Sequence, residues 1–324
     1  GWGPGPLTRA RQARQRLLRR PVRLVLLERS GGTRFAPSHA FWLNRRSRAV
    51  VARVNGPVER ADLVWVMSQD PLAPAVRRAL ARDLGRLRPG TPVLNPLATY
   101  DSYHADDAFP RLAAAGVRVP RTLGPADVGR TEAVWKRQGE QASHKLRGTY
   151  DGPRPGYRAF EAVDSRGPDG LHRRWRAWYV AGLVFPGDVV ASTDWQAGLS
   201  TLQTLDRTFT LRPDEEALLR RAAQVLGLDA FAVDLLRPGG DGPAVLVDVN
   251  VYPTLVDGSD LHLDAGLPPA HGQWHSWDAP ARAGVRGFPG AGFWAALDEA
   301  LLAAAAGAPL ASTGSAAGRS PRSG

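Results

Sequence analysis

The segment DAFAVDLLRPGGDGPAVLVDVN, residues 229–250, carries the pattern that decides the fold. Its two ends are apolar runs of β-forming residues and its middle is a turn rich in Gly, Pro and Asp, which predicts a β-hairpin. With the turn centred near Gly240–Gly242, Asp234 stands directly opposite Asp248, and the two Cβ atoms lie about 5 Å apart on one face. Asn250 lies two residues beyond Asp248, so it points to the same face.

These three polar side chains form one aligned set on a strand pair that is otherwise apolar. The opposite face is predicted to enter a core and carries Val233, Leu235, Val247 and Val249. Two carboxylates and one amide oxygen match a hard-cation site, with waters and phosphate oxygens completing the coordination of Mg²⁺. The alternative is a solvated polar face on which both carboxylates point into water. Because Asp is depleted in strands and an unpaired buried charge is costly, we favour the metal site, with Asp234, Asp248 and Asn250 as ligands.

Lysine is scarce in this chain: only two of its 42 Lys and Arg residues are Lys, at Lys136 and Lys145. Both lie in EAVWKRQGEQASHKLRG, residues 132–148. A lysine is a compact point charge and an arginine a planar fork, so the two are not interchangeable at a tight phosphate site. Lys136 ends an apolar strand before a Gly-containing loop, which favours a functional role. For Lys145, chance is an equally good interpretation.

Short apolar runs alternate with helical segments from residue 22 to residue 121, which predicts an open α/β domain. The strands are expected at 22–27, 49–54, 62–67 and 91–95, and the helices at 74–87 and 105–115. The segment between the first two strands begins with a Gly-containing loop, residues 28–35.

The chain from residue 122 onward reads as a second domain. Strands are expected at 131–136, 159–163 and 174–180, the last continuing through a turn into a hairpin, and residues 138–158 are expected to be a polar, Gly-rich connection. The clearest helix is 214–226, because Pro213 precedes it, acids occupy its first turn and Gly227 follows it.

Composition excludes several classes of protein. With no Cys, the chain has no disulfides, thiolate zinc sites or cysteine nucleophiles. No stretch approaches the roughly 18 apolar residues of a membrane span, and the start lacks the apolar region of a signal peptide, so we expect cytoplasmic residence.

The net charge of +11 is concentrated at the two ends of the chain. Residues 1–21 read as a basic, flexible arm with six Arg, and residues 309–324 as a disordered tail with two more. Without these eight arginines the charge is about +3. A non-catalytic or nucleic-acid-associated protein that binds through its arm is therefore kept only as the alternative function.

A second constellation, HGQWHSWD, contains His271, His275 and Asp278 at a spacing that would suit zinc on a helix. Gly272 interrupts the pair and prolines flank the segment, so a loop packed by tryptophans is the favoured interpretation.

The order of these motifs resembles the ATP-grasp superfamily over about residues 22–300, with glutamate-ligase-like and glutathione-synthetase-like members closest. EAVWK with its Gly-containing loop is similar to the strand that ends in the ATP-phosphate lysine, here Lys136. RRWRAWYVAGLVFPGD is similar to the strand pair with a substrate- or phosphate-facing arginine, Arg176 in preference to Arg174. AVDLL followed by LVDVNVYP resembles the metal hairpin.

The resemblance implies an α/β protein in which an open α/β domain, residues 22–121, precedes a two-lobed ATP-grasp domain, residues 122–308. Its small lobe would span about 122–168 and its large lobe about 169–308. It also implies that ATP and Mg²⁺, or Mn²⁺ in its place, activate a carboxylate as an acyl phosphate for attack by an amine or a similar nucleophile. The carboxylate, the acceptor and the oligomeric state, a dimer included, stay open.

The same resemblance assigns roles to single residues. Lys136 would touch the α- and β-phosphates, and the loop 138–148 would close over them, with Gly148 allowing close backbone approach. Lys145 would reach a phosphate on closure, and Arg176 would stabilise charge on the transferred phosphoryl group. Glu161 would lie near the adenine or ribose, with an ordinary surface Glu as the alternative.

Two departures from the family pattern stand out. The second metal ligand is most often Glu in this family, whereas here it is Asp248, which has a shorter reach. A further ATP lysine commonly precedes the strand of Lys136, but no lysine exists there, so Arg111 or Arg121 would have to replace it.

The variant Lys136→Arg tests the inference from lysine scarcity. It keeps the charge and changes only the shape of the group, so we expect it to lose ATP binding and turnover. Calorimetric titration with Mg-ATP measures the binding. Wild-type affinity and turnover in the variant would show that the scarcity of lysine is accidental.

Overall fold

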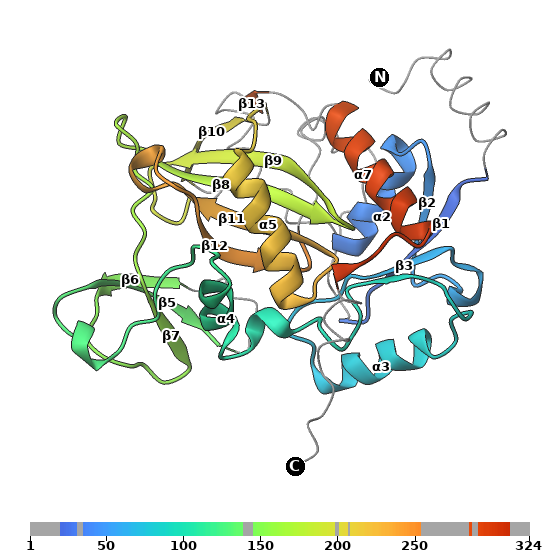
Figure 1. The fold of residues 1–324 in the computed structure, drawn as a ribbon, viewed down its shortest axis with the longest axis horizontal. Coiled ribbons are helices and arrows are strands. Elements are labelled where there is room, and N and C mark those ends of the chain that lie inside the picture. The colour runs from blue at the N-terminus through green and yellow to red at the C-terminus, as the bar shows by residue number, and fades with distance from the viewer. Residues whose placement is uncertain are drawn as a thin grey trace.

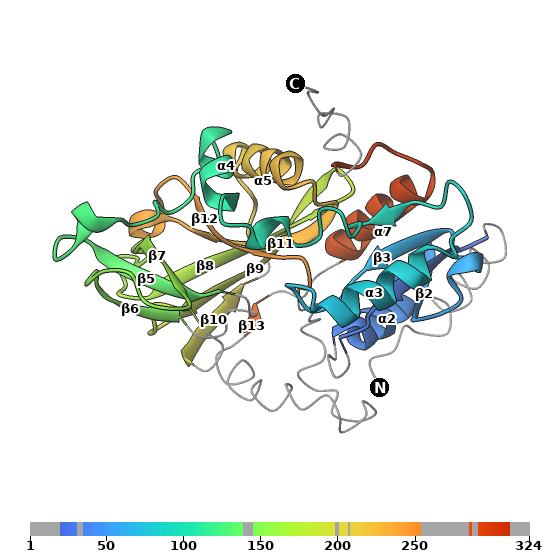
Figure 2. The same ribbon diagram turned by 90° about the horizontal axis from the view of Figure 1, so that it is seen from below.

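The computed structural model describes residues 20–30, 35–138, 145–197, 201–206, 208–253, 285–286 and 291–311. Three sheets follow one another along these residues, with four, three and six strands. Figures 1 and 2 show the three-stranded and four-stranded sheets at opposite ends of the six-stranded sheet. The mixed α/β fold class is as predicted.

The four-stranded sheet is parallel and has the order β2-β1-β3-β4. Its strands are β1 (Val22–Leu27), β2 (Val50–Val54), β3 (Leu63–Val66) and β4 (Val93–Leu94), and its helices are α2 (Phe35–Arg46) and α3 (Pro74–Leu84). Leu24 and Leu26 enter one hydrophobic cluster and Val25 and Leu27 another, so β1 is buried on both faces. Such burial explains its unbroken apolar sequence.

Helix α2 has no counterpart among the sequence predictions. It carries no acid in its first turn, and its apolar pattern includes Pro37 and His39, so the usual start signals are missing. Ala36, Ala40 and Leu43 are buried at helical spacing, and packing against the sheet holds the helix in place.

The three-stranded sheet is antiparallel and has the order β6-β5-β7. Its strands are β5 (Glu132–Arg137), β6 (Lys145–Thr149) and β7 (Tyr157–Glu161). The prediction of a continuous connection over residues 138–158 is therefore wrong, because β6 lies inside it. Trp135, Ala159 and Tyr150 form a small core on one face, and Lys136 belongs to the other face.

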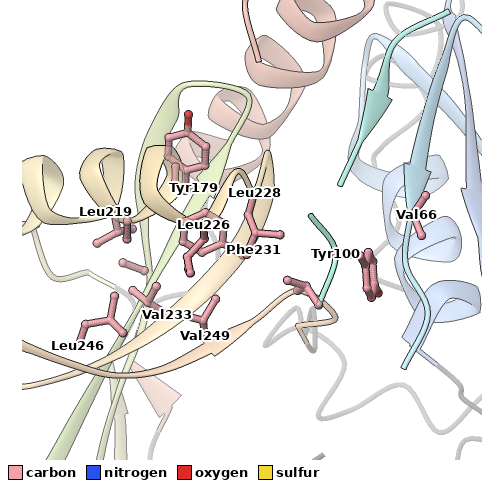
Figure 3. Packing of buried hydrophobic residues seen from close by; sticks show 14 of the residues in the cluster. Val66, Tyr100, Tyr179, Leu219, Leu226, Leu228, Phe231, Val233, Leu246 and Val249 are labelled. Carbon is pink, nitrogen blue, oxygen red and sulfur yellow. The ribbon is translucent and has the colours of Figure 1, made fainter. Parts of the chain in front are cut away.

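The six-stranded sheet has the order β12-β11-β8-β9-β10-β13. Its strands are β8 (His172–Val180), β9 (Leu183–Ser192), β10 (Leu202–Asp206), β11 (Ala230–Leu236), β12 (Val245–Asn250) and β13 (Val285–Arg286). Helix α5 (Pro213–Leu226) covers one face, where Leu219 and Leu226 pack with Phe231 and Val233 (Figure 3). Gly227 ends this helix in the left-handed conformation at φ 64°, as its position after the helix suggests.

The predicted hairpin is β11–β12, and Asp234 pairs with Asp248 as expected. One detail of the prediction is wrong. The register slips after this pair, so that Leu235 faces Leu246 and Val247 becomes the extra residue of a β-bulge. Leu246 therefore takes the core position that the regular alternation assigned to Val247 (Figure 3).

The other elements of the described residues are short, apart from helix α7 (Ala291–Ala305). They are η1 (Val58–Arg60), η2 (Ser102–His104), α4 (Ala108–Ala114), η3 (Pro125–Asp127) and η5 (Pro238–Gly240). Helix α7 packs on strands of both larger sheets. Its Leu297 and Leu301 share one buried cluster with Trp65 of β3 and Trp178 of β8.

A buried polar clamp fixes the end of β4 to the start of β11. The side-chain oxygen of Asn95 accepts hydrogen bonds from the backbone N–H groups of Asp229 (2.8 Å) and Ala230 (2.9 Å). Its Nδ2 donates to the carbonyl oxygen of Ala230 (2.5 Å), and its own N–H donates to the Asp229 carboxylate (3.1 Å). Asn95 is fully buried at φ 57°, a conformation that Asn tolerates better than most residues.

Replacing the clamp residue by its isostere should destabilise the protein. In Asn95→Asp the donor to the Ala230 carbonyl becomes an acceptor, and a second carboxylate enters beside Asp229. We expect the free energy of unfolding to fall by about 2 to 4 kcal/mol in urea titrations.

The matched control is Asn55→Asp, at another left-handed Asn whose side-chain oxygen accepts one bond from the N–H of Glu28 (3.0 Å). That acceptor survives the change, so the effect should stay within about 1 kcal/mol. Equal losses in the two variants would contradict the role given to the clamp.

Candidate functional site

Three charged side chains form a row across the centre of the six-stranded sheet. The register pairs Arg176 of β8 with Asp234 of β11, and Asp234 with Asp248 of β12. The Arg176 guanidinium donates two hydrogen bonds to Asp234, of 2.9 Å and 3.1 Å. Arg174, one alternation earlier on the same face, lies 3.6 Å from the same carboxylate.

This charged row occupies only part of its face. Farther along the same strands, Trp178, Val180 and Ala232 lie on that face and are buried in an apolar cluster. Asn250 pairs with Ala232, so it stands where the charged part meets the apolar part. The three predicted metal ligands therefore share one face, as the alternation of a strand requires.

A second charged row, on the three-stranded sheet, meets the first. The register places Lys145, Lys136 and Arg158 side by side on β6, β5 and β7. The Lys145 Nζ lies 3.0 Å from one oxygen of Asp248, and the Lys136 Nζ lies 3.5 Å from the other. Both lysines of the chain thus converge on one carboxylate.

Two further groups hold Lys136 in place. Its ammonium donates to the carbonyl oxygen of Val247, which the bulge in β12 sets beside Asp248. The hydroxyl of Tyr103 donates to Asp248 (2.9 Å) and lies 3.4 Å from the Lys136 Nζ. The rings of Phe109 and Phe160 lie 5.7 Å and 5.9 Å from the same ammonium, at cation–π distance.

The electrostatics follow from burial and from these contacts. Burial lowers the pKa of Lys136 to about 8, although Asp248 opposes the shift. Burial alone would raise the pKa of Asp248, but Lys136 and Lys145 outweigh it and hold that pKa well below the usual range. Likewise, burial would raise the pKa of Asp234, and Arg174 and Arg176 bring it below the ordinary value. Both carboxylates are therefore ionised at neutral pH.

The donor set fits a magnesium ion that is bound together with phosphates. Within the described residues, no group of three or more His, Cys, Asp or Glu side chains could hold a metal by itself. Mg²⁺ is commonly bound by only one or two carboxylates plus phosphate oxygens, and Asp234 and Asp248 supply that number. In addition, the buried Nδ2 of Asn250 has no hydrogen-bond partner among the described residues. The two ends of an amide are alike in shape, so this end marks a place for a ligand.

Two of the predicted nucleotide-binding residues do not join the cluster. Gly148 pairs with Ala133 on β5, and a Cβ there would meet the Trp135 ring at 3.9 Å, so Gly148 belongs to the face opposite Lys136. Glu161 also pairs with Ala133, at the end of β7, and forms an ion pair of 3.4 Å with Arg121.

The two arginines considered as replacements for the missing lysine are engaged elsewhere. Arg111 donates to the carbonyl oxygens of Ser102 (3.2 Å) and Val225 (3.3 Å), and Arg121 to Asp127 (2.9 Å). The His271, His275 and Asp278 constellation lies outside the described residues, as do residues 1–19 of the basic arm and residues 312–324 of the tail.

Sequence reasoning missed Tyr103 and Arg158. Arg158 lies in the alternating run YRAFE, so a correct strand start would have placed it on the face of Lys136. Tyr103 lies in a short 3₁₀ turn, and no local pattern marks it as a partner of Asp248.

Comparison with known proteins identifies the fold. No family model matches the chain, and no curated protein matches it. Among solved structures, the ATP-grasp ligase PsnB, complexed with a phosphomimetic variant of its minimal precursor, Mg and ADP, has a TM-score of 0.53 at 15% identity, covering 79% of this chain and 97% of its own.

The macrocyclase MdnC from Microcystis aeruginosa MRC, bound with precursor peptide MdnA, has a TM-score of 0.50 at 12% identity and covers 79% and 98%. The chain has the ATP-grasp fold. The resemblance in the order of the sequence motifs is thereby confirmed at the level of the fold. Within the described part of this ATP-grasp chain, no helix is both long and apolar enough to cross a membrane.

The contact between the two rows predicts a pH-dependent contribution to stability. In Asp248→Asn, two lysines lose their common counter-charge, and the free energy of unfolding at pH 7 should fall by about 3 kcal/mol. The folded-state pKa of Asp248 lies below its unfolded value, so its stabilisation is present above about pH 4 and lost as the pH falls further. The difference from wild type should therefore shrink in acid.

Urea titrations followed by tryptophan fluorescence at neutral and acid pH measure this difference. The matched control is Asp169→Asn, which breaks an exposed two-point ion pair with Arg173. Solvent screens such pairs, so little change is expected. A loss in Asp248→Asn that does not vary with pH would contradict the electrostatic explanation.

Proposed function

We propose that the protein is an ATP- and Mg²⁺-dependent ligase that activates a carboxylate as an acyl phosphate for attack by an amine or a similar nucleophile. The observation that carries the proposal is the meeting of the two rows: Lys136 and Lys145 from one sheet converge on Asp248, beside Asp234 and Asn250. The ATP-grasp fold of the solved ligases supports it.

The two ammonium groups of this site suit the negative charge of a triphosphate. Lys136 and Lys145 lie on adjacent strands, with their ammonium groups directed to one carboxylate oxygen each. An anionic phosphate chain can replace Asp248 as their partner, because lysine ammonium groups bind phosphate as point charges. Phosphate contact would also favour the charged form of Lys136, which burial alone disfavours.

Asp248, released from the lysines, would then serve as a metal ligand together with Asp234. When bound, Mg²⁺ neutralises charge on the phosphates during phosphoryl transfer. Asp234 and Asp248, with the Asn250 amide, would hold it on the six-stranded sheet. Arg176 lies beside Asp234, so its guanidinium would stabilise charge on the transferred phosphoryl group.

The solved structures suggest a first substrate class. PsnB is complexed with a variant of its minimal precursor, and MdnC is bound with a precursor peptide. We therefore extend the proposal to peptides as donors of the carboxylate, to be tested beside free amino acids and dicarboxylic acids.

The proposal predicts that Asp248→Ala loses Mg-ATP binding by at least about 100-fold while the protein stays folded, because a metal ligand is removed. Calorimetric titration with Mg-ATP gives the affinity, circular dichroism reports the fold, and Asp169→Ala serves as the surface control. Unchanged affinity in Asp248→Ala would refute the metal assignment.

Turnover is tested by ADP release from ATP with a pool of amino acids, dicarboxylic acids and Glu-containing peptides, each with and without added amine. Release that depends on both components is expected of a ligase. Wild-type protein that binds ATP but releases no ADP under any of these conditions would contradict the ligase.

A further inference from the structure

The charged row extends onto a fourth strand. Asp188 of β9 lies beside β8, with its Oδ1 3.6 Å from a terminal nitrogen of Arg174. Burial alone would lower the pKa of Arg176, and first Asp234 and then Asp188 raise it, so the charge of Asp188 acts on Arg176 as well as on Arg174. Asp188 is the one carboxylate of this row that the proposed metal site does not use.

A β-bulge includes Asp188. Trp175 pairs with Val189 and Ala177 with Pro186, so Gly187 and Asp188 together face the single residue Arg176. A Cβ on Gly187 would lie 3.0 Å from the Arg176 carbonyl oxygen and 3.1 Å from the Trp178 ring. Glycine is therefore required for β9 to approach this closely. Asp188 lies two residues before Val190, which pairs with Arg174, so it belongs to the charged face.

Asp188 and Arg174 do not complete their hydrogen bonds with one another. Among the described residues, the buried Oδ1 of Asp188 and the buried Nε of Arg174 have no hydrogen-bond partner. Arg174 lies 3.6 Å from both Asp188 and Asp234, beyond hydrogen-bond range. Buried charged groups are normally hydrogen-bonded, so the Asp188 oxygen and the Arg174 Nε are left as an acceptor and a donor for the polar groups of a ligand.

We propose that Asp188 binds the ammonium group of a primary amine and accepts its proton, which makes the nucleophile of the ligation an amine rather than a hydroxyl. The inference rests on the proposed ligase function. In the proposed function, Asp234 and Asp248 would hold the metal and Arg176 would face the phosphoryl group, so these three residues of the row have a partner once ATP and the metal ion are bound. Asp188 is then left as an acceptor next to the reacting phosphate.

Charge favours an ammonium group at this position. An ammonium brings one positive charge and three N–H donors, so it can satisfy the Asp188 oxygen and offset its charge together. An alcohol brings a single donor and no charge, and it would leave a partly buried carboxylate without compensation. Arg174, between Asp188 and Asp234, is placed to bind the carboxylate substrate through its fork.

The step balances as follows. The ammonium gives one proton to the Asp188 carboxylate, and the freed nitrogen lone pair forms a bond to the carbonyl carbon of the acyl phosphate. The bond between that carbon and the bridging oxygen breaks, and its electron pair leaves with inorganic phosphate. The second proton of the nitrogen passes to the departing phosphate, and Asp188 returns its proton to solvent.

Two small nucleophiles separate this role from activation of the carboxylate. Hydroxylamine is uncharged near neutral pH and traps an acyl phosphate as a hydroxamate without needing a proton acceptor. Methylamine is an ammonium ion at the same pH and needs one. Each is added with ATP, Mg²⁺ and the pool of amino acids, dicarboxylic acids and peptides, and mass spectrometry counts hydroxamates and methylamides.

We expect wild-type protein to form both products. In Asp188→Asn, hydroxamate should stay within about threefold of wild type while methylamide falls by about 100-fold or more, with a raised KM for methylamine and an unchanged KM for ATP. Asp188→Glu keeps the charge and should recover methylamide to within about tenfold of wild type. Asp169→Asn is the surface control, and retained hydroxamate shows that each variant is folded.

Three outcomes overturn the inference. Methylamide formation could persist in Asp188→Asn, both products could fall in parallel, or wild-type protein could transfer the acyl group to glycerol and not to methylamine. Absence of hydroxamate with wild-type protein is a different failure: it would refute the acyl phosphate, and with it both the proposed function and this role of Asp188.

Discussion

The pairing of two lysines with Asp248 is the interaction on which the arrangement of the site depends. Lys136, Lys145 and Arg158 are like charges on adjacent strands, and so are Asp234 and Asp248, of which Arg176 balances only Asp234 within its own row. Facing one another, the rows offset these charges within the protein. The same contacts hold the three-stranded sheet against the six-stranded sheet, so the packing of these two sheets and the ionisation of the site have one common origin.

Backbone irregularities then place the polar groups. The bulge at Val247 sets a carbonyl oxygen beside the Lys136 ammonium, and at the bulge in β9 Gly187 and Asp188 both face Arg176. Regular alternation would have placed the Val247 side chain in the core. The clamp of Asn95 on Asp229 fixes where β11 begins and therefore where Asp234 lies along the sheet. Local departures from ideal strands thus decide which atoms meet.

The sequence predicted the parts that one strand pair specifies. The opposition of Asp234 and Asp248 followed from two apolar runs and a turn. Lys136, which its rarity singled out, lies beside Asp248, and its role in phosphate binding stays a prediction. Strand β6 could not be recognised, because KLRGT lacks apolar alternation and forms a strand only by pairing with β5. Tyr103 could not be found either, since its contact with Asp248 joins residues 145 positions apart. The sequence could have indicated Asp188 as a candidate site residue, because it too is an acid inside an apolar strand.

Helix α7 completes the hydrophobic core of the first sheet, although it lies far from that sheet in the sequence. Leu297 and Leu301 share a buried cluster with Trp65 of β3 and Trp178 of β8, and Figure 1 shows this helix beside the N-terminal strands. During synthesis, N-terminal segments emerge first and domains generally fold as units. Here the first sheet leaves the ribosome with part of its apolar face uncovered, and the face closes only after residues 291–305 have been made. A nascent chain of this protein therefore has a period of exposure to chaperones that a self-contained first domain would not have.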